Sequence, residues 1–202
     1  MKPVGILRFP GTNCDADVMV ALNDLKLPNE YIWWADRFDP NKYSSFVLPG
    51  GFSYGDYLRA GALAVLAPAM EDLRVASKKG LPVLGICNGF QILCEAKLLD
   101  GVLTKNISQK FQDEWVVLTG SVKLPIAHSM GRFLATEETL KTLFDQDQIW
   151  LQYETNPNGS LKDIAGITNR QKNVRALMPH PERAMHGWMG SSDGRRIFEV
   201  LN

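Results

Sequence analysis

Short apolar runs alternate with helical patterns through the first half of the chain, and this alternation sharply limits the folds open to it. Strand-like runs lie at residues 4–9, 30–35, 44–51 and 81–86. Helical spacing follows Asp15, a candidate N-cap, and recurs at residues 68–79 and 88–98. Almost continuously apolar strands that are separated by helices form parallel sheets covered on both faces. The sequence therefore predicts an α/β fold with a mostly parallel central sheet and helices on both faces.

The second half of the chain continues the strand signals. Further runs lie at residues 114–120, 149–154, 163–168 and 174–178, and helices are expected to begin near Thr136 and Asp193. No internal repeat, low-complexity tract or linker divides the 202 residues. A chain of this length can bury one sizeable core. We therefore expect a single domain that spans residues 1–202.

Charge and cysteine content argue against several classes of function. Basic and acidic residues balance at 22 each, so no basic surplus indicates nucleic acid or an anionic membrane as a partner. The three cysteines, Cys14, Cys87 and Cys94, form neither a disulfide framework nor a zinc-type spacing, and the scattered histidines indicate no metal site. Arg8 and Pro10 interrupt the first apolar run before a signal peptide could form. We expect a soluble protein of the reducing cytoplasm.

Residues 85–89, with the sequence GICNG, combine a strand end, two glycines and a cysteine. This is the form of a nucleophile elbow, a sharp strand-to-helix turn that leaves no room for side chains two positions to either side. The helix start favours the thiolate of Cys87, and the amide of Asn88 would face an oxyanion formed there. Cys87 is therefore the candidate nucleophile. Cys94, on an apolar helix face, is expected in the core, whereas Cys14 after its Pro-Gly turn fits either role.

A thiolate nucleophile needs a base, and His180 is the best candidate among the three histidines. It follows the strand predicted at residues 174–178. Glu182, two residues further on, could accept from one imidazole nitrogen and leave the other for the sulfur. His128 and His186 lack such a neighbour in the sequence, and we expect structural or peripheral roles for them.

Gly50 and Gly51 end the strand predicted at residues 44–51, in a turn where bare amides can approach a ligand closely. This strand end and the one before Cys87 both fall at the carboxyl edge of the sheet, where open α/β folds bind ligands. The amide of Gly51 is the candidate second donor of an oxyanion hole, beside the amide of Asn88. The chain contains neither GxxxxGK[ST] nor GxGxxG, so it shows no nucleotide site of its own.

Together, the PGG turn, the G-x-C-x-G elbow and the late H-P-E resemble the class I, triad-type glutamine amidotransferases. Within that class the chain is similar to the family of glutaminase subunits of phosphoribosylformylglycinamidine synthase. The similar stretches, which cover nearly the whole chain, are FPGTNCDAD, LPGGFSYGDYLRAGALA, GICNGFQILCEAKLL, NPNGSLKDIAGITN and MPHPERAM. The resemblance implies a flavodoxin-like fold, with Cys87 as nucleophile, His180 as base and Glu182 as its orienting acid.

The same resemblance implies a substrate, a product and partners. Gln91, four residues after Cys87, would help to bind glutamine together with Gly50 and Gly51. Glutamine would be hydrolysed through a thioester, and the ammonia would pass to a separate synthetase subunit. That subunit would bind ATP and Mg²⁺ and convert formylglycinamide ribonucleotide to formylglycinamidine ribonucleotide in purine biosynthesis. A small accessory subunit would complete the assembly, and this chain would bind no cofactor.

The segment 106–133 departs from the family pattern. The chain has NISQKFQDEW where the family tends to carry a Cys-Arg pair after N-x-S-x-x-F. The family's H-G-E-G-R-[FY] is replaced by HSMGRF at residues 128–133. The sequence leaves open whether this segment contributes to a subunit interface or to the mouth of the site.

Two other functions stay open from the residues alone. The same triad would serve a cysteine hydrolase or peptidase of similar fold, which would act on a different substrate. A non-catalytic regulatory subunit could also carry this fold, although all the chemical groups of a triad are present. Oligomeric state, subunit stoichiometry, the ammonia route and the activity of the isolated chain are not set by the sequence.

Overall fold

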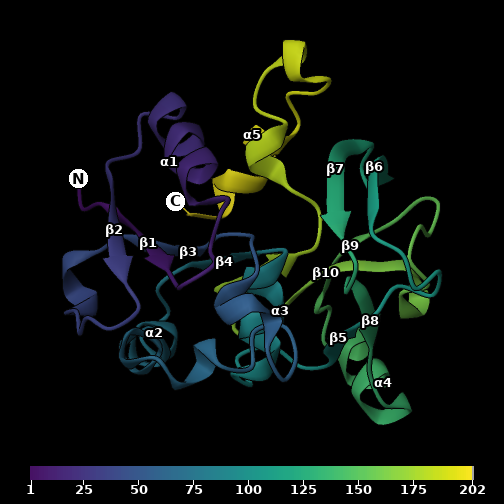
Figure 1. Ribbon diagram of the computed structural model, residues 1–202, viewed down its shortest axis with the longest axis horizontal. Helices are drawn as coiled ribbons and strands as arrows, with labels where there is room; N and C mark the ends of the chain where they lie inside the picture. Colours follow the sequence, from purple (N-terminus) through teal and green to yellow (C-terminus); the bar gives the residue numbers. More distant parts are fainter. Residues whose placement is uncertain (202) are drawn as a thin grey trace.

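The computed structural model describes residues 1–201, and a seven-stranded sheet forms its centre (Figure 1). Its strands are β1 (Val4–Arg8), β2 (Asn29–Trp33), β3 (Ser45–Leu48), β4 (Val83–Ile86), β9 (Ile149–Gln152), β10 (Ile164–Thr168) and β11 (Val174–Leu177). Their order across the sheet is β2-β1-β3-β4-β11-β10-β9. Neighbours from β2 to β11 are parallel, and β10 is antiparallel to both of its neighbours. The mostly parallel sheet predicted from the sequence is confirmed.

Helices cover both faces of this sheet. The α-helices are α1 (Asp15–Asp24), α2 (Pro68–Lys78), α3 (Asn88–Glu95), α4 (Glu137–Asp145) and α5 (Gly194–Phe198). Short 3₁₀ helices span Pro40–Lys42, Ser53–Asp56, Ala64–Leu66, Leu161–Asp163, Pro181–Arg183, Gly187–Met189 and Glu199–Leu201. In Figure 1, α1 and α5 lie above the sheet and α2 and α3 below it. This double cover explains why β3 and β4 are buried at every position.

The carboxyl ends of three central strands meet at one edge of the sheet. Leu48 of β3 pairs with Gly85 of β4, and Ile86 of β4 pairs with Leu177 of β11. The amide of Cys87 continues this pairing, because it donates to the Leu177 carbonyl at 2.9 Å. The loops that follow these strands therefore emerge side by side, where open α/β sheets bind ligands.

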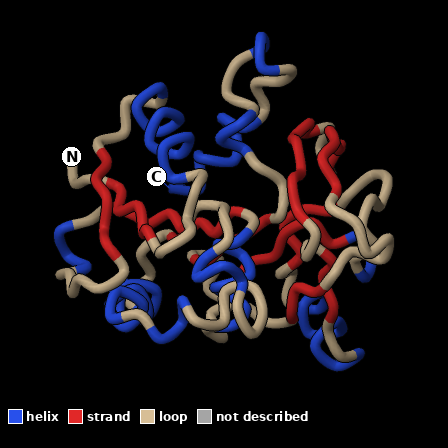
Figure 2. The backbone as a smooth tube through the Cα atoms, viewed as in Figure 1, coloured by secondary structure: helices blue, strands red, loops and turns tan. Residues whose placement is uncertain are grey.

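The remaining strands form two small sheets beside the central one. They are β5 (Val102–Thr104), which pairs with β8 (Arg132–Leu134), and β6 (Gln112–Leu118), which pairs with β7 (Val122–His128). The β6–β7 hairpin projects to one side of the central sheet (Figure 2), and the end of β6 is joined to the end of β9 by the Thr119 amide, which donates to the Gln152 carbonyl at 2.9 Å. A strand was predicted at residues 114–120, but β7 was not, because Pro125 interrupts its alternating pattern. Proline is tolerated here because both strands of a two-stranded sheet are edge strands.

Two helix starts agree with the sequence and one does not. Thr136 caps α4, its hydroxyl accepting from the Thr139 amide, and Asp193 is the N-cap of α5. Asp15 was predicted to cap α1, but Cys14 holds that position and Asp15 is the first helical residue. The carboxylate of Asp15 lies 2.6 Å from Nε of Arg8. It therefore pairs with the guanidinium instead of capping backbone amides.

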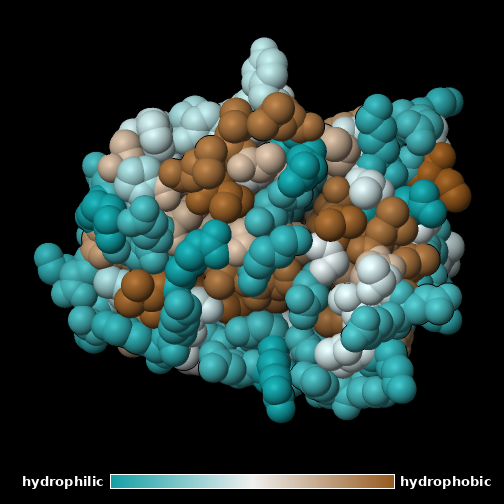
Figure 3. Space-filling model, turned by 90° about the horizontal axis from the view of Figure 1, so that it is seen from below, coloured by the Kyte–Doolittle hydropathy of each residue, from teal (hydrophilic) through white to brown (hydrophobic). Residues whose placement is uncertain are grey.

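The core lies on both sides of the sheet, with Phe46, Leu84 and Phe90 among its fully buried side chains. The face over α2 and α3 carries apolar side chains between hydrophilic ones (Figure 3). Among residues 1–201, no helix is long and apolar enough to span a membrane.

Candidate active site

The turn at Cys87 has the geometry that the GICNG pattern predicts. Cys87 links β4 to α3 with φ 50° and ψ −103°, a conformation that is strained for a residue with a side chain. A Cβ on Gly85 would lie 2.6 Å from Cδ1 of Leu93. A Cβ on Gly89 would overlap the carbonyl oxygen of Leu48. Both glycines are therefore required for the nucleophile position to be presented at the start of α3.

Two backbone amides beside this turn are free to bind an anion. Asn88 is the first residue of α3, so its amide has no partner within the helix. Gly51 has φ 146°, and a Cβ there would lie 2.8 Å from the Asn13 nitrogen and from the Gly11 oxygen. Neither amide donates a hydrogen bond to any acceptor among residues 1–201. These are the two donors that the sequence predicted for an oxyanion hole.

His180 and Glu182 form a buried pair after β11. Nδ1 of His180 lies 2.5 Å from Oε1 of Glu182, and the two residues are only 2% and 3% exposed. Burial lowers the pKa of His180, but the Glu182 carboxylate, together with the neighbouring Cys87 and Cys14, outweighs burial and holds that pKa well above its ordinary value. Because Nδ1 faces a carboxylate, we assign its proton there, which leaves Nε2 to exchange one. Nε2 is buried and has no hydrogen-bond partner among the described residues.

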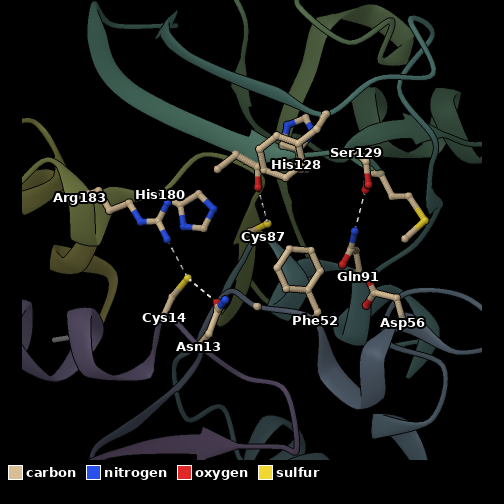
Figure 4. Close-up of a pocket in the computed structure, with 14 residues that line it drawn as sticks. Asn13, Cys14, Phe52, Asp56, Cys87, Gln91, His128, Ser129, His180 and Arg183 are labelled. Atoms are coloured by element: carbon tan, nitrogen blue, oxygen red, sulfur yellow. Dashed lines mark hydrogen bonds between the residues drawn. The ribbon is translucent and has the colours of Figure 1, made fainter.

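The nucleophile position and the histidine converge over Gly50. A Cβ on Gly50 would lie 2.7 Å from Cε1 of His180 and 3.4 Å from Cβ of Cys87, so only glycine fits beneath them. Sγ of Cys87 faces the Ala127 carbonyl at 4.0 Å. Figure 4 shows Cys87 and His180 on adjacent walls of one cavity. The fold thus brings together residues from three separate loops.

Gln91 lies in a hydrogen-bonded cluster on the first turns of α3. Nδ2 of Asn88 donates to Oε1 of Gln91 at 2.8 Å, and Nε2 of Gln91 donates to the Met130 carbonyl at 2.7 Å. Oδ1 of Asn88 accepts from the Ser53 amide at 3.1 Å. Both polar atoms of the Gln91 side chain are therefore occupied. Gln91 ties α3 to the loop that follows β7, and it lines the cavity at the same time.

The cavity above these groups has a volume of about 220 Å³. It is lined by Asn13, Cys14, Gly51, Phe52, Asp56, Cys87, Gln91, Phe111, Ala127, His128, Ser129, Met130, His180 and Arg183. Residues 127–130 at the end of β7 form one of its walls. The divergent segment 106–133 therefore contributes to the mouth of the site, one of the two places that the sequence left open.

The sequence left the role of Cys14 open and gave no role to Arg183, and both residues line the cavity. A guanidinium nitrogen of Arg183 donates to Sγ of Cys14 at 3.2 Å, and Sγ in turn contacts Oδ1 of Asn13 at 3.2 Å. Cys14 follows β1, another parallel strand that ends at this edge of the sheet, and this position in the sequence could have placed Cys14 at the site.

Candidate metal-ligand atoms of Cys14, His180 and Glu182 lie within 4.8 Å of one another. Oε1 of Glu182 is already engaged with Nδ1 of His180.

The two remaining histidines and Cys94 lie in three different places: the cavity wall, the surface and the core. His128 was expected to be structural or peripheral, but it lines the cavity, with Nδ1 3.1 Å from Oδ1 of Asn106. Burial, and then the charge of His180, lower the pKa of His128 to about 4. His186 lies at the surface, 2.6 Å from Oδ2 of Asp24. Cys94 is buried in the core, as predicted, and burial raises the pKa of its thiol.

Comparison with known proteins agrees with this geometry. Residues 2–197 match the family of CobB/CobQ-like glutamine amidotransferase domains. The chain belongs to that family. The matched residues include the elbow, the Gly-Gly turn and the His180–Glu182 pair, so the whole cavity lies within the family domain.

Close relatives share almost the full length of the chain. It is 44% identical to phosphoribosylformylglycinamidine synthase subunit PurQ from Methanosarcina mazei, over 98% of this chain and 96% of the relative. It is 48% identical to the protein of that name from Parasynechococcus marenigrum, over 98% of each. A chain in the structure of PurLQS from Thermotoga maritima superposes with a TM-score of 0.89 and is 38% identical, covering 100% of this chain and 98% of that one.

A more distant structure shares only the fold. A putative GMP synthase protein from Thermoplasma acidophilum superposes with a TM-score of 0.60 at 15% identity, over 100% of this chain and 92% of that one.

Proposed function

We propose that this protein is the glutaminase subunit of phosphoribosylformylglycinamidine synthase, in de novo purine biosynthesis. The observation that carries this proposal is a cysteine held in a strained elbow beside a buried His–Glu pair, in a chain 44–48% identical to PurQ subunits. The whole chain would act as one glutaminase domain. Its product would be ammonia, supplied to a synthetase.

The proposed reaction begins at Cys87. Its thiolate attacks the side-chain amide carbon of glutamine, and the negative charge that develops on the amide oxygen is stabilised by the amides of Gly51 and Asn88. His180 then protonates the leaving nitrogen, which departs as ammonia and leaves a thioester on Cys87. Nε2 of His180 next takes a proton from water, which attacks the thioester and releases glutamate. Throughout, Glu182 orients the imidazole and stabilises its charged form.

The proposed partners follow from the fate of ammonia. A synthetase subunit would receive it and convert formylglycinamide ribonucleotide to formylglycinamidine ribonucleotide, and a small accessory subunit would complete the complex. ATP and Mg²⁺ would bind to the synthetase, because this chain lacks both common phosphate-binding glycine motifs. The assembly is expected in the cytoplasm.

The test is synthesis of formylglycinamidine ribonucleotide by the complete complex, with glutamine or with ammonium chloride as the nitrogen source. Cys87→Ala should lower the glutamine-dependent rate by about 10³-fold or more and should leave the ammonia-dependent rate of the synthetase intact. Cys94→Ala is the matched control, because its thiol lies in the core, away from the cavity.

Two outcomes would contradict the proposal. If both rates of the Cys87→Ala complex persist, the chain is a non-catalytic subunit. If the wild-type complex shows no response to glutamine but the chain cleaves peptides, the triad belongs to a peptidase.

A further inference from the structure

The cavity has one acidic wall. Among the described residues that line it, Asp56 is the only one with a carboxylate near Gln91, and His180 and Arg183 lie on the other side of Cys87. Figure 4 shows Asp56 next to Gln91, facing the cavity from the loop that follows Gly51. Its Oδ1 lies 3.4 Å from Nδ2 of Asn88, the neighbour of Cys87 in the chain. The carboxylate therefore lies on the α3 side of the nucleophile position.

No cation neutralises this carboxylate within the described chain. Asp56 forms no salt bridge with any basic side chain among residues 1–201, and the one hydrogen bond to its carboxylate is the 3.4 Å bond from Nδ2 of Asn88. The residue is partly buried, and this burial raises its pKa to about 6. A partly desolvated carboxylate without a cation is costly, and a bound positive group would relieve that cost.

The backbone holds Asp56 in place at some conformational cost. Tyr54, Asp56 and Leu58 have φ values of 52°, 55° and 66°, in the left-handed region that residues with side chains seldom occupy. The Ser53 amide, at the start of this segment, donates a hydrogen bond to Oδ1 of Asn88. The carboxylate is thus presented by a fixed loop next to the elbow, and its position is coupled to that of Cys87 through Asn88.

From this placement we propose that Asp56 binds the α-ammonium group of the substrate glutamine and selects for it. The inference rests on the proposed function, because it takes the substrate to be attacked at Cys87. The α-carbon of glutamine lies three bonds from the amide carbon, about 4 Å away. With the amide carbon at Sγ of Cys87 and its oxygen at the two free amides, the ammonium end extends along α3 towards Asp56. The polar atoms of the Gln91 side chain are already hydrogen-bonded to Asn88 and Met130, so Gln91 holds these two residues in place beside the bound substrate.

The experiment compares two substrates of the assembled complex: L-glutamine and glutaramate, which is glutamine without its α-amino group. The wild type should prefer glutamine strongly in kcat/KM. Asp56→Asn, which keeps the shape of the side chain but removes its charge, should lower that preference by about 10- to 100-fold. Most of the change should appear as a higher KM for glutamine. Asp145→Asn, the same change at an exposed position near the end of α4, is the control and should keep the preference of the wild type.

The alternative outcomes are distinct. If Asp56→Asn lowers kcat/KM equally for both substrates, or if the wild type does not distinguish them, the residue has a purely structural role and the inference is wrong. An intact KM for glutamine in a folded Asp56→Asn complex would also overturn it. If the wild-type complex hydrolyses neither substrate, the proposed function itself fails.

Discussion

Among the groups that raise the pKa of the proposed base His180, Glu182 contributes most. Its carboxylate contacts Nδ1 of His180 at 2.5 Å in a site from which water is almost excluded. Because it raises the pKa of His180, it favours the imidazolium that must form when Cys87 becomes a thiolate. We therefore expect the negative charge of Glu182, and not only its hydrogen bond to His180, to contribute to the glutaminase rate.

Glu182→Gln tests this point, because it retains an acceptor for Nδ1 but removes the charge. We expect glutaminase kcat to fall by about 10²- to 10⁴-fold. Removal of the carboxylate lowers the pKa of His180, so the limb of the pH profile that reports on this imidazole should move to lower pH. Glu199→Gln, at an exposed position, is the matched control. An unchanged profile and rate in Glu182→Gln would show that the pair has no role in the reaction.

Single residues also mark the limit of what the sequence could predict. Cys87 and the His180–Glu182 pair were recognisable because each lies in a local pattern with an acid or glycine close by. The Arg183–Cys14 contact was not, because its partners lie 169 positions apart. Asp56 was also not predicted. Its proposed role rests on the finding that no basic side chain lies near its carboxylate in the folded structure, and a local sequence pattern does not show this.

The β4–α3 elbow depends on the absence of two side chains. Gly89 packs so closely on the Leu48 carbonyl of β3 that the helix start and the neighbouring strand are in direct backbone contact. This contact places α3, with its free Asn88 amide, next to the Gly-Gly turn that ends β3. One close approach therefore sets the spacing between both proposed oxyanion donors.

Gly89→Ala should consequently destabilise the protein and disable the site together. The added methyl group has no space beside the Leu48 carbonyl, and overpacking of this kind costs about 1–3 kcal/mol of unfolding free energy. Urea unfolding, with the glutaminase rate of the fraction that stays folded, measures both effects. Gly187→Ala is the control, since a Cβ there meets no atom within 4 Å. If Gly89→Ala were as stable and active as that control, the close approach would be irrelevant to the site.

At the scale of the whole molecule, parallel topology brings together residues that are remote in sequence. The alternation of apolar strands and helices predicted which strand ends share an edge, and hence that the Gly-Gly turn, Cys87 and His180 would meet. It did not predict the β6–β7 hairpin, whose Pro125 hides the pattern of β7. That hairpin supplies residues 127–130 of the cavity wall, so sequence patterns described the centre of the site better than its mouth.

The three thiols of the molecule lie in three different surroundings, and their reactivity tests the central claim most directly. An electrophilic diazoketone analogue of glutamine, added to the complex, should attach once, and peptide mapping by mass spectrometry should locate it on Cys87. Excess glutamine should protect that thiol. Cys94 should stay unmodified because burial raises the pKa of its thiol, and Cys14 because it lies beside the elbow and not in it. Attachment to Cys14 or Cys94, or no attachment at all, would contradict the assignment of Cys87 as the nucleophile.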